Sequence, residues 1–203
     1  MSIQKLKITL VSNNSDIIKE TADVFPPDLY PNIIPVYCNI SQCTSHDCIV
    51  SPANSFGHMD GGIDRTLSYI LMKDYDENYI GRRVREVIKE KYSGEQPVGT
   101  CILIETHSSK FPYLAHAPTM TVPTNVVRTL NSYYAFKAVL EEIQMYNQQC
   151  IAQDREQFMI KSVLTTTFCT GCGEMSIHNS LIQMKKAYDI VCNPVVSTWE
   201  AAH

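Results

Sequence analysis

The stretch that decides the fold reads Ser51-Pro52-Ala53-Asn54-Ser55-Phe56-Gly57-His58-Met59-Asp60-Gly61-Gly62-Ile63-Asp64, from residue 51 to residue 64. It follows the apolar run Cys48 to Ser51, which predicts a buried strand. It leads into Leu67, Ile70 and Leu71, whose spacing predicts a helix starting near Asp64. Glycines between a strand and a helix let the backbone approach a ligand closely, and the amide groups at a helix start favour an anion. The stretch therefore predicts a ligand-binding loop.

A second loop of the same kind follows the Thr- and Val-rich run Ser162 to Phe168, which predicts a central strand. Its sequence is Thr170-Gly171-Cys172-Gly173, and a helical pattern marked by Ile177 and Leu181 comes after it. Two such loops on neighbouring strand ends can hold the two phosphates of a pyrophosphate. Neither loop matches the dinucleotide fingerprint or the phosphate loop with its lysine, so the residues alone leave plain turns as the alternative.

The remainder of the chain alternates strand patterns with helix patterns, which predicts an α/β fold with helices packed on a largely parallel or mixed sheet. The other expected strands are Lys7 to Ser12, Ile33 to Tyr37, Thr100 to Glu105 and Tyr113 to Ala117. The other expected helices carry Ile17 to Phe25, Ile80 to Ile88 and a long segment from about Asn125 to Gln149.

Composition limits the possible functions. A length of 203 residues favours one domain, and 44% hydrophobic against 19% charged residues is typical of a chain that folds alone. The net charge of −4 and the absence of a basic stripe disfavour a nucleic-acid partner. The first residues lack the pattern of a signal peptide, and no run is long enough to span a membrane. We therefore expect a cytoplasmic protein with no membrane partner.

The eight cysteines raise the question of a metal site or a disulfide framework. Cys38, Cys43 and Cys48 are evenly spaced, but only Cys169 and Cys172 form a close pair of the kind that zinc sites use twice. Without a secretory signal, thiols are expected to stay reduced and to pack as small hydrophobic groups. The sequence predicts no metal ligands, and a redox role for Cys169 and Cys172 is a weaker alternative.

The order of these features resembles the macro domain family. The resemblance covers about residues 33 to 189 and is carried by four segments in order, namely Val36 to Ile40, Asp47 to Asn54, Asp60 to Asp64 and Thr170 to Gly173. It implies a three-layer α/β/α fold with a central mixed sheet, which we expect to form a single domain over residues 1–203. It also implies ADP-ribose, or an ADP-ribosylated protein, as the ligand and no cofactor. Several members hydrolyse ADP-ribosyl esters or a terminal phosphate on ADP-ribose.

The resemblance assigns roles to individual residues of this sequence. Asn39, followed by Ile40, stands where the family has an aspartate that accepts a hydrogen bond from the adenine amino group. Asn54 matches a contact to the distal ribose, the sugar that carries the scissile bond. Asp64 matches the acid that orients the ribose or the attacking water, so Asp64 and Asn54 are the candidate catalytic residues. The residues implied to lie under the phosphates and the distal ribose are Gly61, Gly62, Ile63, Thr170, Gly171, Cys172 and Gly173.

Departures from the family pattern and simpler interpretations stand beside these assignments. Asp60 replaces a glycine, which brings a carboxylate near the expected pyrophosphate, and the second loop lacks an aromatic residue. Asn54 can instead be a turn residue, and Asp64 a helix cap. The sequence thus predicts ADP-ribose binding with hydrolysis at the distal ribose, with a non-catalytic reader of ADP-ribosylated proteins as the alternative.

Overall fold

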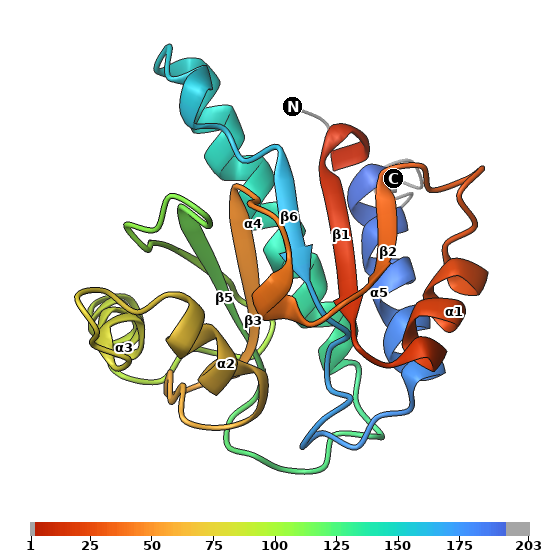
Figure 1. Cartoon of the computed structure of the whole chain (residues 1–203), viewed down its shortest axis with the longest axis horizontal. Helices are drawn as coiled ribbons and strands as arrows, with labels where there is room; N and C mark the ends of the chain where they lie inside the picture. The colour runs from red at the N-terminus through yellow and green to blue at the C-terminus, as the bar shows by residue number, and fades with distance from the viewer. Residues whose placement is uncertain (1–2, 194–203) are drawn as a thin grey trace, which may run out of the picture.

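The computed structural model describes residues 3–193 and folds them around one mixed sheet (Figure 1). Within this range the sheet has six strands, in the spatial order β2 (Ile33–Tyr37), β1 (Lys7–Ser12), β6 (Ser162–Thr165), β3 (Cys48–Asn54), β5 (Tyr113–Met120) and β4 (Ile102–Glu105). β4 pairs antiparallel with β5, and all other neighbours are parallel. The parallel strands therefore end at one edge of the sheet, the lower edge in Figure 1, where ligands bind in open α/β sheets.

Helices cover both faces of the sheet and complete three layers (Figure 1). One face carries α1 (Ser15–Val24), α4 (Asn131–Ala152) and α5 (Ile177–Cys192), and the other carries α2 (Gly62–Ile70) and α3 (Tyr79–Tyr92). Short 3-10 helices lie at Ile3–Lys5, Ile40–Gln42 and Glu156–Phe158. The α/β/α fold with a central mixed sheet, predicted from the sequence, is confirmed.

Alternation along the buried strands explains the two cores. Val50 packs with Phe136 and other side chains of the α4 and α5 layer, whereas its neighbour Ile49 packs with Leu67 and Val84 of the α2 and α3 layer. Successive side chains of a strand point to opposite faces, so a strand covered on both faces is apolar throughout. The continuous apolar run before Ser51 is therefore the signal of a central strand.

Several element boundaries differ from the sequence-based expectation, and three of them border the cleft or its loops. The long helix starts at Asn131 rather than near Asn125, because residues 125–130 form a loop in which Val126 N donates to Gly173 O at 3.0 Å. Val127 and Leu130 fitted a helical pattern but are exposed. β6 ends at Thr165 instead of Phe168, and β3 extends beyond Ser51 to Asn54 because it continues to pair with β5.

The statements on membrane helices and on domain number depend on which residues the structure describes. Among residues 3–193, no helix is long and apolar enough to cross a membrane. Residues 1–2 and 194–203 lie outside the described residues, so a single domain over residues 1–203 stays a prediction.

Candidate functional site

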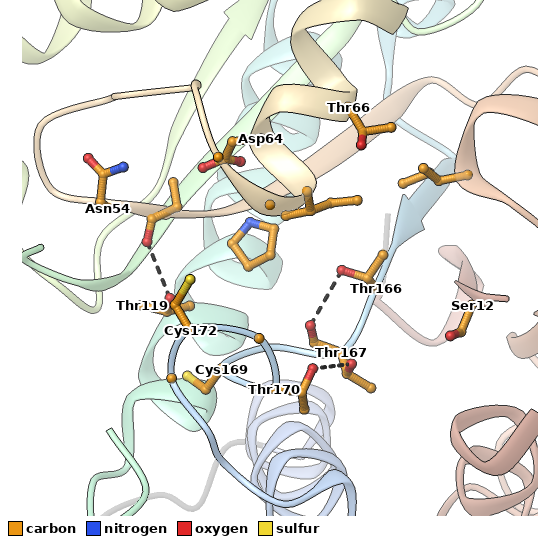
Figure 2. A pocket seen from close by; sticks show the side chains of 18 of the residues that line it. Ser12, Asn54, Asp64, Thr66, Thr119, Thr166, Thr167, Cys169, Thr170 and Cys172 are labelled. Atoms are coloured by element: carbon orange, nitrogen blue, oxygen red, sulfur yellow. Dashed lines mark hydrogen bonds between the residues drawn. The ribbon is translucent and has the colours of Figure 1, made fainter. Parts of the chain in front are cut away.

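A cleft of about 470 Å³ opens at the edge where the parallel strands end (Figure 2). Its walls come from the ends of β1, β3 and β5, from the loop after β6 and from the start of α2. The structure brings every sequence-predicted site residue to this cleft, namely Asn39, Ile40, Asn54, Gly61, Gly62, Ile63, Asp64, Thr170, Gly171, Cys172 and Gly173. Segments that are more than a hundred residues apart in the sequence thus share one cavity.

Asp64 is the buried carboxylic acid of the cleft. Its side chain lies in the first turn of α2, is 6% exposed, and accepts a hydrogen bond from Ser51 Oγ at 2.5 Å. Burial raises its pKa to about 6; the hydrogen bond from Ser51 opposes this shift, and the charge of Asp60 adds to it. Gly61, not Asp64, is the N-cap of the helix. The carboxyl group is therefore engaged in a hydrogen bond with Ser51 on β3.

Asn54 ends β3 and holds the first glycine loop together. Its Oδ1 accepts hydrogen bonds from Phe56 N at 3.1 Å and His58 N at 3.2 Å, while its Nδ2 donates to His58 O at 2.8 Å. These are the contacts of a turn residue, and they satisfy the backbone of residues 56–58. The ligand role of Asn54 stays a prediction.

Gly61 and Gly62 form the open part of this loop. A Cβ atom at either position would meet no other atom within 4 Å, so both glycines leave free space above the backbone. Gly62 also has a φ of +53°, which side-chain-bearing residues adopt only with strain. A ligand can therefore approach the backbone here, next to the N-terminus of α2.

The second glycine loop, residues 166–176, is held mainly by backbone hydrogen bonds. Glu174 N donates to Gly171 O at 2.9 Å and Met175 N donates to Cys169 O at 3.0 Å, while Cys169 and Glu174 adopt positive φ. The hydroxyl groups of Thr167 and Thr170 are 2.8 Å apart. Figure 2 shows Thr167, Thr170 and Cys172 on this loop, across the cleft from the start of α2, which carries Asp64.

Asn39 lies in the wall next to the 3-10 helix Ile40–Gln42 and caps it. Its Oδ1 accepts hydrogen bonds from Ser41 N at 3.0 Å and from Ser41 Oγ at 2.9 Å. The oxygen that the resemblance assigns to the adenine amino group thus already accepts two hydrogen bonds.

Sequence reasoning missed several polar residues of the cleft. They share one position in the fold, just at or after the carboxyl end of a parallel strand, and are Ser12, Asn13, Thr119, Thr166 and Thr167. Thr119 Oγ1 donates to Ala53 O at 3.2 Å and so ties β5 to β3 at the cleft floor. Their position at the ends of predicted strands was the signal by which sequence reasoning could have found them.

Two further observations concern the chemistry of the site. Among the described residues, no group of three or more His, Cys, Asp or Glu side chains is placed to hold a metal ion. The described lining residues include no Phe, Tyr or Trp.

Comparisons with known proteins agree with this architecture. The macro domain of Mycobacterium tuberculosis DarG has a TM-score of 0.58 and 13% identity, covering 77% of this chain and 89% of that one. An Oceanobacillus iheyensis macrodomain solved with ADP has a TM-score of 0.46 and 15% identity, covering 75% and 88% of the two chains. Curated protein sequences gave no match. The macro domain family model matches residues 50–184, which include both glycine loops, and the chain therefore belongs to the macro domain family.

Proposed function

We propose that this protein binds ADP-ribose in the cleft and hydrolyses an ADP-ribosyl ester, or a related bond, at the distal ribose. ADP-ribose binding is typical of the macro domain family to which the chain belongs. A cleft of about 470 Å³ lies within the range of about 300–1,000 Å³ that small-molecule sites occupy. The observation that carries the proposal is the buried Asp64 carboxyl group between two glycine loops.

The two loops suit the pyrophosphate. Gly61 and Gly62 leave open space at the N-terminus of α2, where backbone amides and the helix dipole favour a negative charge. Gly171 on the facing loop likewise leaves open space, and the Thr170 hydroxyl beside it can donate to a phosphate oxygen. Backbone groups fixed by the fold hold a sugar phosphate without further ordering, which supplies proximity and orientation.

Asp64 supplies the base in this proposal. With a pKa of about 6 its carboxyl group is mostly ionised at neutral pH, yet it keeps more affinity for a proton than an exposed aspartate has. It can accept a proton from a water that attacks the anomeric carbon of the distal ribose or the ester carbonyl carbon. The hydrogen bond from Ser51 fixes the orientation of the carboxylate.

A reader module is the second candidate function, and one observation favours it. Asn54 uses the atoms that would contact the distal ribose for bonds to residues 56–58, and only 6% of Asp64 is exposed. A protein with this geometry can bind ADP-ribose on a modified protein without positioning a water for attack.

The decisive experiment compares wild-type protein with Asp64→Asn, which keeps the size of the side chain. Calorimetry measures ADP-ribose affinity, and release of label from a protein ADP-ribosylated on carboxylates measures turnover. We expect Asp64→Asn to lower turnover about a hundredfold while changing affinity less than about threefold, because a base acts in the transition state. Wild-type turnover is expected to rise with pH through about 6.

The outcomes of this experiment test both functions and the role of Asp64. Binding without any release of label by the wild-type protein supports the reader and rejects the hydrolase. Failure to bind at millimolar ADP-ribose rejects both functions. An Asp64→Asn variant that retains full turnover removes Asp64 from the reaction.

A further inference from the structure

Two cysteine side chains meet in the wall of the cleft beside the 3-10 helix Ile40–Gln42. The Sγ atoms of Cys38 and Cys43 are 2.9 Å apart, although both residues are free thiols. A disulfide bond has an S–S length of about 2.05 Å, so the two sulfur atoms need to approach by only about 0.9 Å to form one. A tight turn holds them in this arrangement, since Gln42 N donates to Asn39 O at 2.9 Å and Cys43 N donates to Ile40 O at 3.3 Å.

The two thiols differ in accessibility. Cys38 is half-buried and lines the cleft, whereas Cys43 is 7% exposed and packs in the core below. Burial and the contact with Cys38 raise the pKa of the Cys43 thiol to about 12, and the charge of Lys110 opposes that shift. The Lys110 ammonium group reaches this turn, where its Nζ donates to Ser41 O at 3.2 Å. An oxidant entering through the cleft therefore meets Cys38 first.

We propose that Cys38 and Cys43 are a redox modification site, at which a disulfide oxidant such as oxidised glutathione converts the thiol pair into an intramolecular disulfide. The Cys38 thiolate attacks one sulfur of the oxidant, forms a mixed disulfide and releases one reduced glutathione. Cys43 then loses its proton and attacks Cys38 Sγ, which releases the second glutathione. The protein loses two protons and two electrons in total, and the oxidant gains them.

The modified segment carries Asn39 and Ile40, which we expect at one end of the bound ligand. A disulfide across it fixes the turn covalently, and a ligand in the cleft covers Cys38 and slows the first step. This protection, unlike the disulfide itself, rests on the proposed binding of ADP-ribose.

The sequence allows the pair to be identified by mass. Trypsin releases one peptide from Glu20 to Arg65 that contains three cysteines, Cys38, Cys43 and Cys48. The full-length protein is treated with oxidised glutathione, denatured, labelled with N-ethylmaleimide and digested. We expect one maleimide, on Cys48, and a Cys38–Cys43 bond that tandem mass spectrometry locates and dithiothreitol removes. A peptide with three maleimides, or with Cys48 in the bond, overturns the proposal.

Variants separate this chemistry from general thiol oxidation. Cys38→Ser and Cys43→Ser each abolish the internal bond, whereas Cys192→Ser retains it, because Cys192 is equally half-buried but lies on α5. Oxidised wild-type protein is expected to melt a few degrees higher than reduced protein, since the bond constrains the unfolded chain. The same treatment leaves the melting temperature of Cys38→Ser unchanged. Equal shifts in wild type and Cys38→Ser contradict the assignment.

ADP-ribose tests the link to the cleft. At a concentration that saturates the thermal shift, we expect ADP-ribose to slow the oxidation at least tenfold, a result that supports entry through the cleft. A thermal shift without protection rejects entry through the cleft. A disulfide that forms in a protein showing no thermal shift with ADP-ribose rejects the proposed function and leaves the thiol pair established.

Discussion

The two glycine loops occupy equivalent places in the fold, yet they are built differently. The loop after β3 is organised by side chains, with Asn54 bonded to the backbone of residues 56–58 and Ser68 Oγ donating to Met59 O at 2.9 Å. This loop and the first turn of α2 that follows it carry both carboxylates among the described lining residues, Asp60 and Asp64. The loop after β6 is organised by backbone hydrogen bonds and presents hydroxyl groups. One side of the cleft therefore carries carboxylates, and the other presents neutral hydroxyl groups.

Glycine itself has a different purpose in each loop. A Cβ atom on Gly61 meets no atom within 4 Å, whereas one on Gly173 would lie 2.5 Å from Cys169 O and 2.7 Å from Val126 Cγ2. The first glycine leaves room for a ligand, and the second lets two segments of the protein touch. Both residues are glycine in the sequence, so only the structure separates a glycine that borders open space from one that is packed against its neighbours.

The largest expected effect comes from a charge placed on the open side of the first loop. Gly61 has a φ of −138°, an ordinary extended conformation, so Gly61→Glu causes no backbone strain. Two like charges about 4 Å apart repel by about 4 kcal/mol at an effective dielectric constant of 20, which corresponds to about a thousandfold loss of ADP-ribose affinity. Gly61→Ala, measured by the same calorimetry, is expected to change affinity less than about threefold. Retained affinity in Gly61→Glu places the pyrophosphate elsewhere.

The buried carboxylate of the first loop predicts a pH-dependent stability. The folded protein raises the pKa of Asp64 from 3.8 to about 6, so it binds a proton more tightly than the unfolded chain does. This contribution to stability is complete below pH 4 and is lost as the pH rises through 6, by about 3 kcal/mol at most. Asp64→Asn lacks this contribution. The unfolding free energy of the wild type minus that of the variant is therefore expected to fall by that amount from pH 4 to pH 7.

The comparison with Asp64→Asn is necessary because His116 acts in the opposite direction. Complete burial lowers the pKa of His116 from 6.5 to about 3, so its contribution to stability grows as the pH rises through the same range. Both proteins contain His116, and its effect cancels in the difference measured by urea unfolding. A difference that stays constant with pH contradicts the buried state of Asp64.

The packing glycine of the second loop predicts a loss of stability. In Gly173→Ala, the new Cβ meets the backbone oxygen of Cys169, which cannot move without disturbing the turn. Overpacking of this kind costs about 1–3 kcal/mol, and we expect about 2 kcal/mol from chemical unfolding. Gly171→Ala, whose Cβ meets no atom within 4 Å, is the matched control and is expected to be nearly neutral. Equal stability of the two variants would falsify the assigned difference between these glycines.

The sequence predicted the fold class because the patterns that mark strands and helices involve only neighbouring residues. The apolar run before Ser51 and the helical spacing after Asp64 each depend on a few neighbouring residues. The sequence predicted β6 as a central strand, but not its place between β1 and β3, because strand order depends on contacts between distant segments. The expectation that Asn125 starts a helix was wrong for the same reason, since residues 125–130 are held by the second glycine loop.

The candidate site was likewise predictable where its signals lie in short motifs, and not where it depends on contacts made by the fold. The glycines, Asn54 and Asp64 could be named from motifs, and the structure brings them to one cleft. Ser51 and Asp64 stand at the two ends of the quoted stretch, but the hydrogen bond between them needs a strand and a helix in contact, which the stretch alone does not show. The contact between Cys38 and Cys43 depends on a turn that the even spacing of the cysteines did not reveal.

The smallest expected effect concerns Asp60, the exposed carboxylate at the rim of the first loop. It lines the ADP-ribose cleft and also a second cavity of about 380 Å³ that includes Arg65 and Arg85. If its charge faces the pyrophosphate, Asp60→Asn raises ADP-ribose affinity about threefold at low salt, and the gain fades at high salt because exposed charges are screened. The same variant lowers the pKa of Asp64, so turnover reaches half its maximum at a lower pH. Glu156→Gln, on the 3-10 helix Glu156–Phe158 before the amino end of β6, controls for net charge and is expected to change neither quantity. Unchanged affinity in Asp60→Asn, together with a lowered pH midpoint, means that the carboxylate turns toward the second cavity while still acting on Asp64.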